Sequence, residues 1–143
     1  MKVYHGTTWH KLSPLASGRD DGRKVSGLYV TDTAERAQLY ADARASGIVE
    51  TSLRYANHSA IVEMDAVVKG WSRRPEDHNT LDKCEATITE WTVIKVTIYV
   101  EQYYLSHTRD KQSPYNDKGE HSRLLIERLQ DEFGEKLHIV IVQ

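Results

Sequence analysis

Three side chains of different chemistry stand at the ends of short apolar runs in this sequence: His5, Tyr29 and Glu90. An imidazole can hydrogen-bond through its ring nitrogens, a phenol ring can lie against a cationic group, and a carboxylate can stabilise developing positive charge. Taken singly, each side chain has a structural explanation as a partly buried histidine, a rim aromatic or the outward-facing residue of an alternating strand. Together they define a candidate site.

The stretch 27–41 is the part of the chain that would position the aromatic groups. Leu28–Val30 has the composition of a strand, and Asp32 with a glutamate three residues later predicts an N-cap and a capping box at the start of a helix. Helical spacing then turns Tyr40 back towards the strand that holds Tyr29. We therefore expect two aromatic rings to flank one cleft.

Length and composition set the broad class. The 143 residues suit a single domain over residues 1–143, and the formal net charge of −2 offers no global attraction to nucleic acid. No apolar run approaches the ~20 residues of a membrane span, and the first residues lack the apolar stretch of a signal peptide, so we expect a cytoplasmic chain. Cys84 is the only cysteine, which excludes an internal disulfide and a cysteine-rich zinc site.

The remaining apolar patterns predict an α+β fold, because strands and helices alternate too irregularly for a doubly wound sheet. Expected strands are Lys2–His5 ending at Gly6, Ser59–Val68, two strands bent near Lys95 within Thr87–Leu105, and Leu137–Val142 in a central position of the sheet. Expected helical segments are Trp9–Leu15, the helix after Asp32 that ends at Gly47, Leu81–Ala86, and Glu120–Phe133 closed by Gly134. Loops are expected over Ser17–Ser26, Lys69–Thr80 and Ser106–Gly119.

The motifs His5-Gly6-Thr7, Gly27–Asp32 with Tyr40, and Glu90–Val93 together resemble a known family. In this order they are similar to the histidine, tyrosine and glutamate motifs of ADP-ribosyltransferases of the diphtheria-toxin and poly(ADP-ribose) polymerase type. The resemblance runs from residue 3 to about Leu105. It implies two small, packed, antiparallel-rich sheets flanked by helices around an NAD cleft, and it needs no GxGxxG turn.

The resemblance implies a binding role for five residues. His5 would hydrogen-bond the adenosine ribose, and Gly6 would present bare backbone to the nicotinamide carboxamide. Thr7 is the third residue of the first motif and would also belong to the NAD-binding residues. Tyr29 and Tyr40 would sandwich the nicotinamide ring, whose positive charge suits an aromatic face.

The resemblance also implies that Glu90 is the catalytic residue. Cleaving the bond between nicotinamide and ribose builds positive charge on the ribose, and a carboxylate beneath it gains attraction as that charge appears. Arg19 or Arg23, from the loop before the Tyr29 strand, would reach the diphosphate or adenine side of NAD.

Two positions depart from the family patterns. Ala37 stands where polymerase-type members carry a serine that binds the nicotinamide amide, so one contact is missing. Ile88, two residues before Glu90, replaces the acid or amide of the arginine-modifying toxins. With no helical regulatory domain, a single transfer of ADP-ribose is preferred to polymer synthesis.

The resemblance implies a mono-ADP-ribosyltransferase that uses NAD as substrate, without a metal and without a membrane. Its acceptor would be a macromolecule, with protein favoured over nucleic acid, and the chain could be a toxin, phage protein or bacterial effector delivered into a host cytoplasm. One alternative is another NAD-using enzyme, either a glycohydrolase or a relative of RNA 2′-phosphotransferases. A third reading is an inactive module that binds NAD or ADP-ribose.

Overall fold

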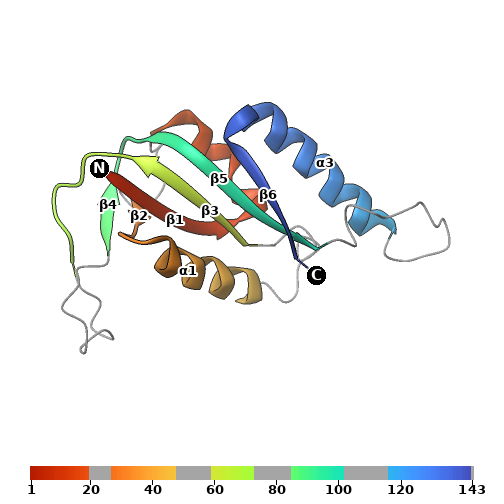
Figure 1. The fold of residues 1–143 in the computed structure, drawn as a ribbon, viewed down its shortest axis with the longest axis horizontal. Helices are drawn as coiled ribbons and strands as arrows, with labels where there is room; N and C mark the ends of the chain where they lie inside the picture. Colours follow the sequence, from red (N-terminus) through yellow and green to blue (C-terminus); the bar gives the residue numbers. More distant parts are fainter. Residues whose placement is uncertain (20–26, 48–58, 73–84, 102–115, 143) are drawn as a thin grey trace.

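The computed structural model describes residues 1–19, 27–47, 59–72, 85–101 and 116–142 (Figure 1). Its strands are β1 (Lys2–Thr8), β2 (Leu28–Val30), β3 (Ser59–Asp65), β4 (Ala86–Ile88), β5 (Thr92–Glu101) and β6 (Leu137–Val142). Its helices are α1 (Ala34–Gly47) and α3 (Asn116–Phe133), with 3₁₀ turns η1 (Trp9–Lys11), η2 (Ser13–Ser17) and η4 (Gly134–Lys136). Helices beside two small, largely antiparallel sheets confirm the α+β class.

The larger sheet has the strand order β1-β3-β5-β6, with antiparallel pairs except for the parallel pair of β5 and β6. The smaller sheet pairs β2 with β4 antiparallel, and Figure 1 shows it at the end of the molecule that carries the N-terminus. Tyr4 and Thr31 join the two sheets through reciprocal backbone hydrogen bonds of 3.0 and 2.7 Å. The chain therefore meets the edge of β1 directly after β2 ends.

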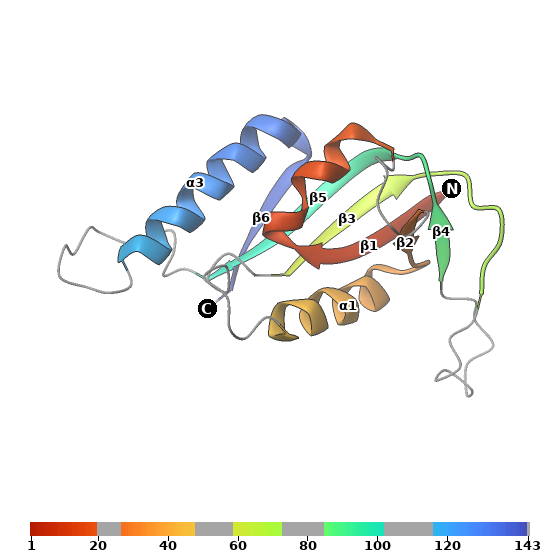
Figure 2. The ribbon, with the colours of Figure 1, turned by 180° about the vertical axis from the view of Figure 1, so that it is seen from behind.

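The core lies between the larger sheet, the 3₁₀ turns and α3. Alternate residues of β5 point into it, as expected for a strand with one buried face: Val96, Ile98 and Val100 are 0% exposed. The turns after β1 add Trp9, Leu12 and Leu15, and α3 adds Leu125, Ile126, Leu129 and Phe133. Figure 2 shows α3 beside β6 and α1 along β1, so the two helices cover different parts of the sheet.

A close contact between β1 and α1 fixes the position of the helix. A Cβ atom at Gly6 would lie 2.0 Å from the carbonyl oxygen of Ala37 and 2.9 Å from the amide nitrogen of Ala41. Both alanines are 0% exposed. Glycine on the strand and small residues on the helix therefore allow the two backbones to touch.

Several expected elements are confirmed. The strand at Leu28–Val30, the turns after Trp9 and the helix that ends at Gly47 are present, and Gly134 takes a left-handed φ of 57° just after α3. The expected helix at Glu120–Phe133 is longer, because α3 begins at Asn116. Among the described residues, no helix is long and apolar enough to cross a membrane.

Two strand boundaries differ from the sequence prediction. β1 continues through Gly6 to Thr8, because residues 6–8 pair with residues 59–61 of β3. In the other direction, β3 ends at Asp65 instead of Val68. Pairing with a neighbour, which composition does not show, sets both ends.

The long β-rich region divides earlier than expected. β4 ends at Ile88 and β5 begins at Thr92, because the first pairs with β2 and the second with β3. Near Lys95 the strand is only irregular: the register shifts there, so that Lys95 faces Glu63 while Val93 faces Met64. Of the expected helix over 81–86, residues 81–84 lie outside the described residues, and Ala86 belongs to β4.

The helix cap and the last strand also need correction. Thr33 caps α1, with its Oγ1 accepting the N–H of Arg36 at 3.2 Å, while Asp32 instead lies 3.6 Å from the Arg36 guanidinium. β6 lies at the edge of the sheet, where Ile141 is 52% exposed, and not in its centre. An apolar run specifies a strand but not its place in the strand order.

Candidate functional site

A pocket of about 340 Å³ opens where β1, β2, α1 and the start of β4 meet. This volume lies within the range of roughly 300–1,000 Å³ that is usual for small-molecule sites. Its walls carry several polar groups among a few apolar ones: His5, Gly6, Tyr29, Val30, Thr31, Tyr40, Arg44 and Glu85. The lining residues come from four segments that are distant in the sequence.

His5 occupies the point where the two sheets separate. Its Nδ1 lies 2.6 Å from the carbonyl oxygen of Tyr29, and the residue is 5% exposed. Because a carbonyl only accepts, Nδ1 carries the proton and donates it. The bond ties β1 to β2 beyond the Tyr4–Thr31 bridge, where the strands diverge, and it fixes both the tautomer and the direction of the imidazole.

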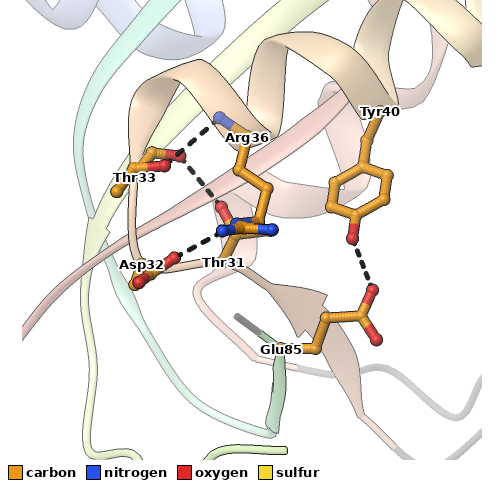
Figure 3. Close-up of polar contacts among 6 residues, drawn as sticks. All are labelled: Thr31, Asp32, Thr33, Arg36, Tyr40 and Glu85. Carbon is orange, nitrogen blue, oxygen red and sulfur yellow. Dashed lines mark hydrogen bonds and ion pairs between the residues drawn. The ribbon is translucent and has the colours of Figure 1, made fainter. Parts of the chain in front are cut away.

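Two tyrosines from consecutive elements line the pocket. Tyr29 stands in the middle of β2 and is 54% exposed, unlike its neighbours Leu28 and Val30, which are buried. Tyr40 comes from the second turn of α1 and is partly buried. A bend between β2 and α1, held by the hydrogen bond from Thr31 Oγ1 to the carbonyl of Thr33 at 3.0 Å, lets the helix bring Tyr40 to the same pocket (Figure 3).

Glu85 supplies the carboxylate of this pocket. It directly precedes β4, and since Ala86 pairs with Val30, Glu85 falls at the end of β2 where the chain turns into α1. Its backbone is held by Ser72 in a reciprocal pair of hydrogen bonds of 2.7 and 3.1 Å. Its Oε1 accepts the Tyr40 hydroxyl at 2.6 Å, a contact drawn in Figure 3. The carboxylate thus faces α1 across the pocket.

Arg44 brings a positive charge to the same pocket. It follows Tyr40 by one helical turn, so both residues lie on the same side of α1. Among the described residues that line this pocket, it is the one guanidinium or ammonium group. Acid, base and cation therefore surround one small volume.

Four of the residues predicted from sequence come together in this pocket: His5, Gly6, Tyr29 and Tyr40. Thr7 does not line it, being 1% exposed within β1. Ala37 is fully buried, and its backbone carbonyl lies against Gly6 at the contact between helix and strand.

The expected convergence of Glu90 with His5 and Tyr29 is not observed. Glu90 lies beyond the opposite end of β4, in a separate hollow of about 490 Å³. Strands rise about 3.3 Å per residue, so five residues can separate it from Glu85 by up to roughly 16 Å. The backbone explains the difference, because Arg19 forms a β-bridge with Glu90 and Trp91 N–H donates to the Gly18 carbonyl at 2.8 Å.

Arg19 also lies in this second hollow and not in the first pocket. The other arginine expected near the diphosphate, Arg23, lies outside the described residues. Two of the polar residues expected at the dinucleotide, Arg19 and Glu90, are therefore neighbours of each other, away from the tyrosines.

Known proteins give no guide to this arrangement. No family model, curated protein or solved structure matches the chain. What the pocket can do must be argued from its own groups: an oriented imidazole, two phenols, a guanidinium and a carboxylate. In the described part of the chain, no three His, Cys, Asp or Glu residues gather as metal ligands would.

Glu85 and Arg44 are the charged pocket residues that the sequence did not predict. Glu85 and Glu90 both stand just before a strand, so composition alone does not distinguish them. For Arg44 a signal existed, since it follows Tyr40 at the i, i+4 spacing of one helix face.

Proposed function

We propose that this chain is a mono-ADP-ribosyltransferase that cleaves NAD between nicotinamide and ribose and transfers ADP-ribose to a macromolecular acceptor. The observation that carries the proposal is the meeting of His5, Tyr29, Tyr40 and a glutamate, Glu85, in one pocket. These are the residue types of the family motifs, in the family order along the chain. In this proposal the catalytic carboxylate is that of Glu85 and not that of Glu90.

The nicotinamide half of NAD fits the tyrosine side of the pocket. Tyr29 exposes its ring, and Tyr40 faces the same volume, so the two phenols can hold a flat cationic ring. Gly6 contributes its backbone to the lining, where it can meet the carboxamide. His5, with its ring oriented by the Tyr29 carbonyl, lines the pocket where the ribose would lie.

Glu85 would act on the ribose. As the C–N bond breaks, nicotinamide leaves as a neutral base and the ribose becomes cationic, and a fixed carboxylate stabilises that charge in the transition state. The acceptor then attacks the sugar carbon, and its proton passes to the carboxylate or to solvent. A hydrogen bond to the 2′-hydroxyl would strengthen in the same step, as in glycoside hydrolysis.

Arg44 takes the role first expected for Arg19. The diphosphate of NAD carries two negative charges, and a guanidinium can form paired, charge-assisted hydrogen bonds with its oxygens. Arg44 lines the pocket, whereas Arg19 lies in the other hollow. A dinucleotide with its nicotinamide between the tyrosines can direct its phosphates towards Arg44.

The test is a reaction of the purified protein with NAD labelled separately in nicotinamide and in adenine. The proposal expects nicotinamide release and, with a cell lysate present, adenine label on macromolecules that mass spectrometry can identify. Release that yields only free ADP-ribose would instead indicate a glycohydrolase. Absence of nicotinamide release with every lysate and acceptor fraction would contradict transfer and leave a binding module.

A further inference from the structure

We propose that Tyr40 has a second task besides facing the nicotinamide: its hydroxyl positions the catalytic carboxylate of Glu85. This inference rests on the proposed function. It assigns the ring and the hydroxyl of one side chain to different steps, with the ring binding substrate and the oxygen acting through Glu85. Tyr40 is then a positioning residue for the bond-breaking step.

The contact itself is strong. Tyr40 Oη lies 2.6 Å from Glu85 Oε1, within the range of about 2.5–2.7 Å that is typical of a hydroxyl donating to a charged carboxylate. The two residues are 45 positions apart in the sequence, and the bond joins α1 to the start of β4 (Figure 3). A hydrogen bond between separate elements restrains the carboxylate from a direction that its own strand does not provide.

The donor side of this bond is held rigidly. Tyr40 lies between Ala37 and Ala41, which are 0% exposed and pack α1 against β1 at Gly6. The helix therefore has little freedom to slide. A hydroxyl that projects from it marks a fixed point in the pocket.

The acceptor side is a flexible side chain at the start of a short strand. Glu85 lies outside the three paired residues of β4, and its backbone forms an isolated bridge with Ser72. Its side chain has three rotatable bonds and is partly exposed. Removing the phenol removes one restraint on these rotamers, and a displacement of about 1 Å from the reacting sugar can cost up to a hundredfold in rate.

The experiment compares Tyr40→Phe with Tyr40→Leu in steady-state cleavage of NAD. Phenylalanine keeps the ring and removes the hydroxyl, so kcat should fall roughly ten- to hundredfold while KM for NAD stays within about twofold. Leucine removes both, so KM should rise as well. Tyr99→Phe, on β5 and away from the pocket, is the matched control and should change neither constant.

A double-mutant cycle with Glu85→Gln then tests whether the hydroxyl acts through the carboxylate. Adding Tyr40→Phe to Glu85→Gln should lower the residual kcat by less than twofold, because the carboxylate to be positioned is already gone. Thermal unfolding of each variant checks that the fold is retained. An equal loss in both backgrounds would overturn the positioning role and leave the proposed function standing.

A wild-type protein that releases no nicotinamide would overturn the proposed function, and with it this inference. A raised KM for NAD with an unchanged kcat in Tyr40→Phe would overturn the inference alone. The two failures are therefore distinguishable.

Discussion

Two hollows in the described part of the chain contain similar residue types in very different settings. The smaller one joins His5, Tyr29, Tyr40 and Glu85 from four segments, and its carboxylate is bound by a phenol from another element. The larger one holds Glu90 and Arg19, whose backbones are bridged to each other. When a glutamate precedes a strand, its surroundings depend on which other strand pairs with that strand. They do not depend on the neighbours of the glutamate in sequence.

The sharpest way to break this comparison is to neutralise each glutamate in turn. Glu85→Gln should lower the rate of NAD cleavage about a hundred- to thousandfold, because it removes the charge that stabilises the cationic ribose. Glu90→Gln is the matched control and should stay within about twofold of the wild type, measured as nicotinamide release. If Glu90→Gln were the variant that lost activity, the site would have to be placed in the larger hollow.

The arginines give the next largest difference. Arg44→Ala should raise KM for NAD about tenfold, with kcat little changed, because a charge-assisted contact to the diphosphate is lost and Arg44 is exposed enough for solvent to weaken it. Arg19→Ala should leave both constants as they are. Initial-rate kinetics over a range of NAD concentrations measure this, and equal effects of the two changes would remove the reason for preferring Arg44.

Substitution of Tyr29 should weaken NAD binding, whereas substitution of Trp91 should lower the stability of the fold. Tyr29→Ala should raise KM for NAD about fivefold through the lost ring contact, with little effect on unfolding, because the side chain is 54% exposed. In the larger hollow, Trp91→Phe should cost about 1–3 kcal/mol of stability, because the Leu15 carbonyl loses the indole N–H at 2.9 Å. Urea unfolding and NAD kinetics on both variants test the contrast, and a stable Trp91→Phe variant with impaired kinetics would contradict it.

The smallest expected effect concerns a histidine outside both hollows. Burial, and to a lesser extent Lys11, lower the pKa of His10 below its ordinary value of 6.5. The unfolded chain therefore binds the proton more readily, so stability is full above pH 6.5 and declines as the pH falls towards the lowered pKa. His10→Gln should flatten this part of the stability curve, measured by urea unfolding from about pH 7.5 to about pH 5. An unchanged slope would show that His10 does not contribute.

Much of the secondary structure could be predicted, because local patterns determine it. The strand at Leu28–Val30 and the helix end at Gly47 follow from composition and from a glycine stop. The cap was missed in detail, because Asp32 and Thr33 are both good N-caps and the bend after Thr31 decides between them. The edge position of β6 could not be predicted from its apolar run.

The site residues could be predicted where they lie in a short local motif. They could not be predicted where strand pairing determines which residue reaches the pocket. His5, Gly6, Tyr29 and Tyr40 lie in two short motifs, and the fold brings these motifs together at the Tyr4–Thr31 bridge. The glutamate depends on how a long β-rich region divides. Because β4 pairs with β2, whereas the following strand β5 pairs with β3, the glutamate that reaches the pocket is the one preceding β4, Glu85.

The most direct test of the central claim is a crystal structure of the Glu85→Gln variant with NAD bound. We expect the nicotinamide ring between Tyr29 and Tyr40, the adjoining ribose beside the amide of residue 85, and the diphosphate near Arg44. A dinucleotide seated instead between Arg19 and Glu90 would contradict the assignment of the site.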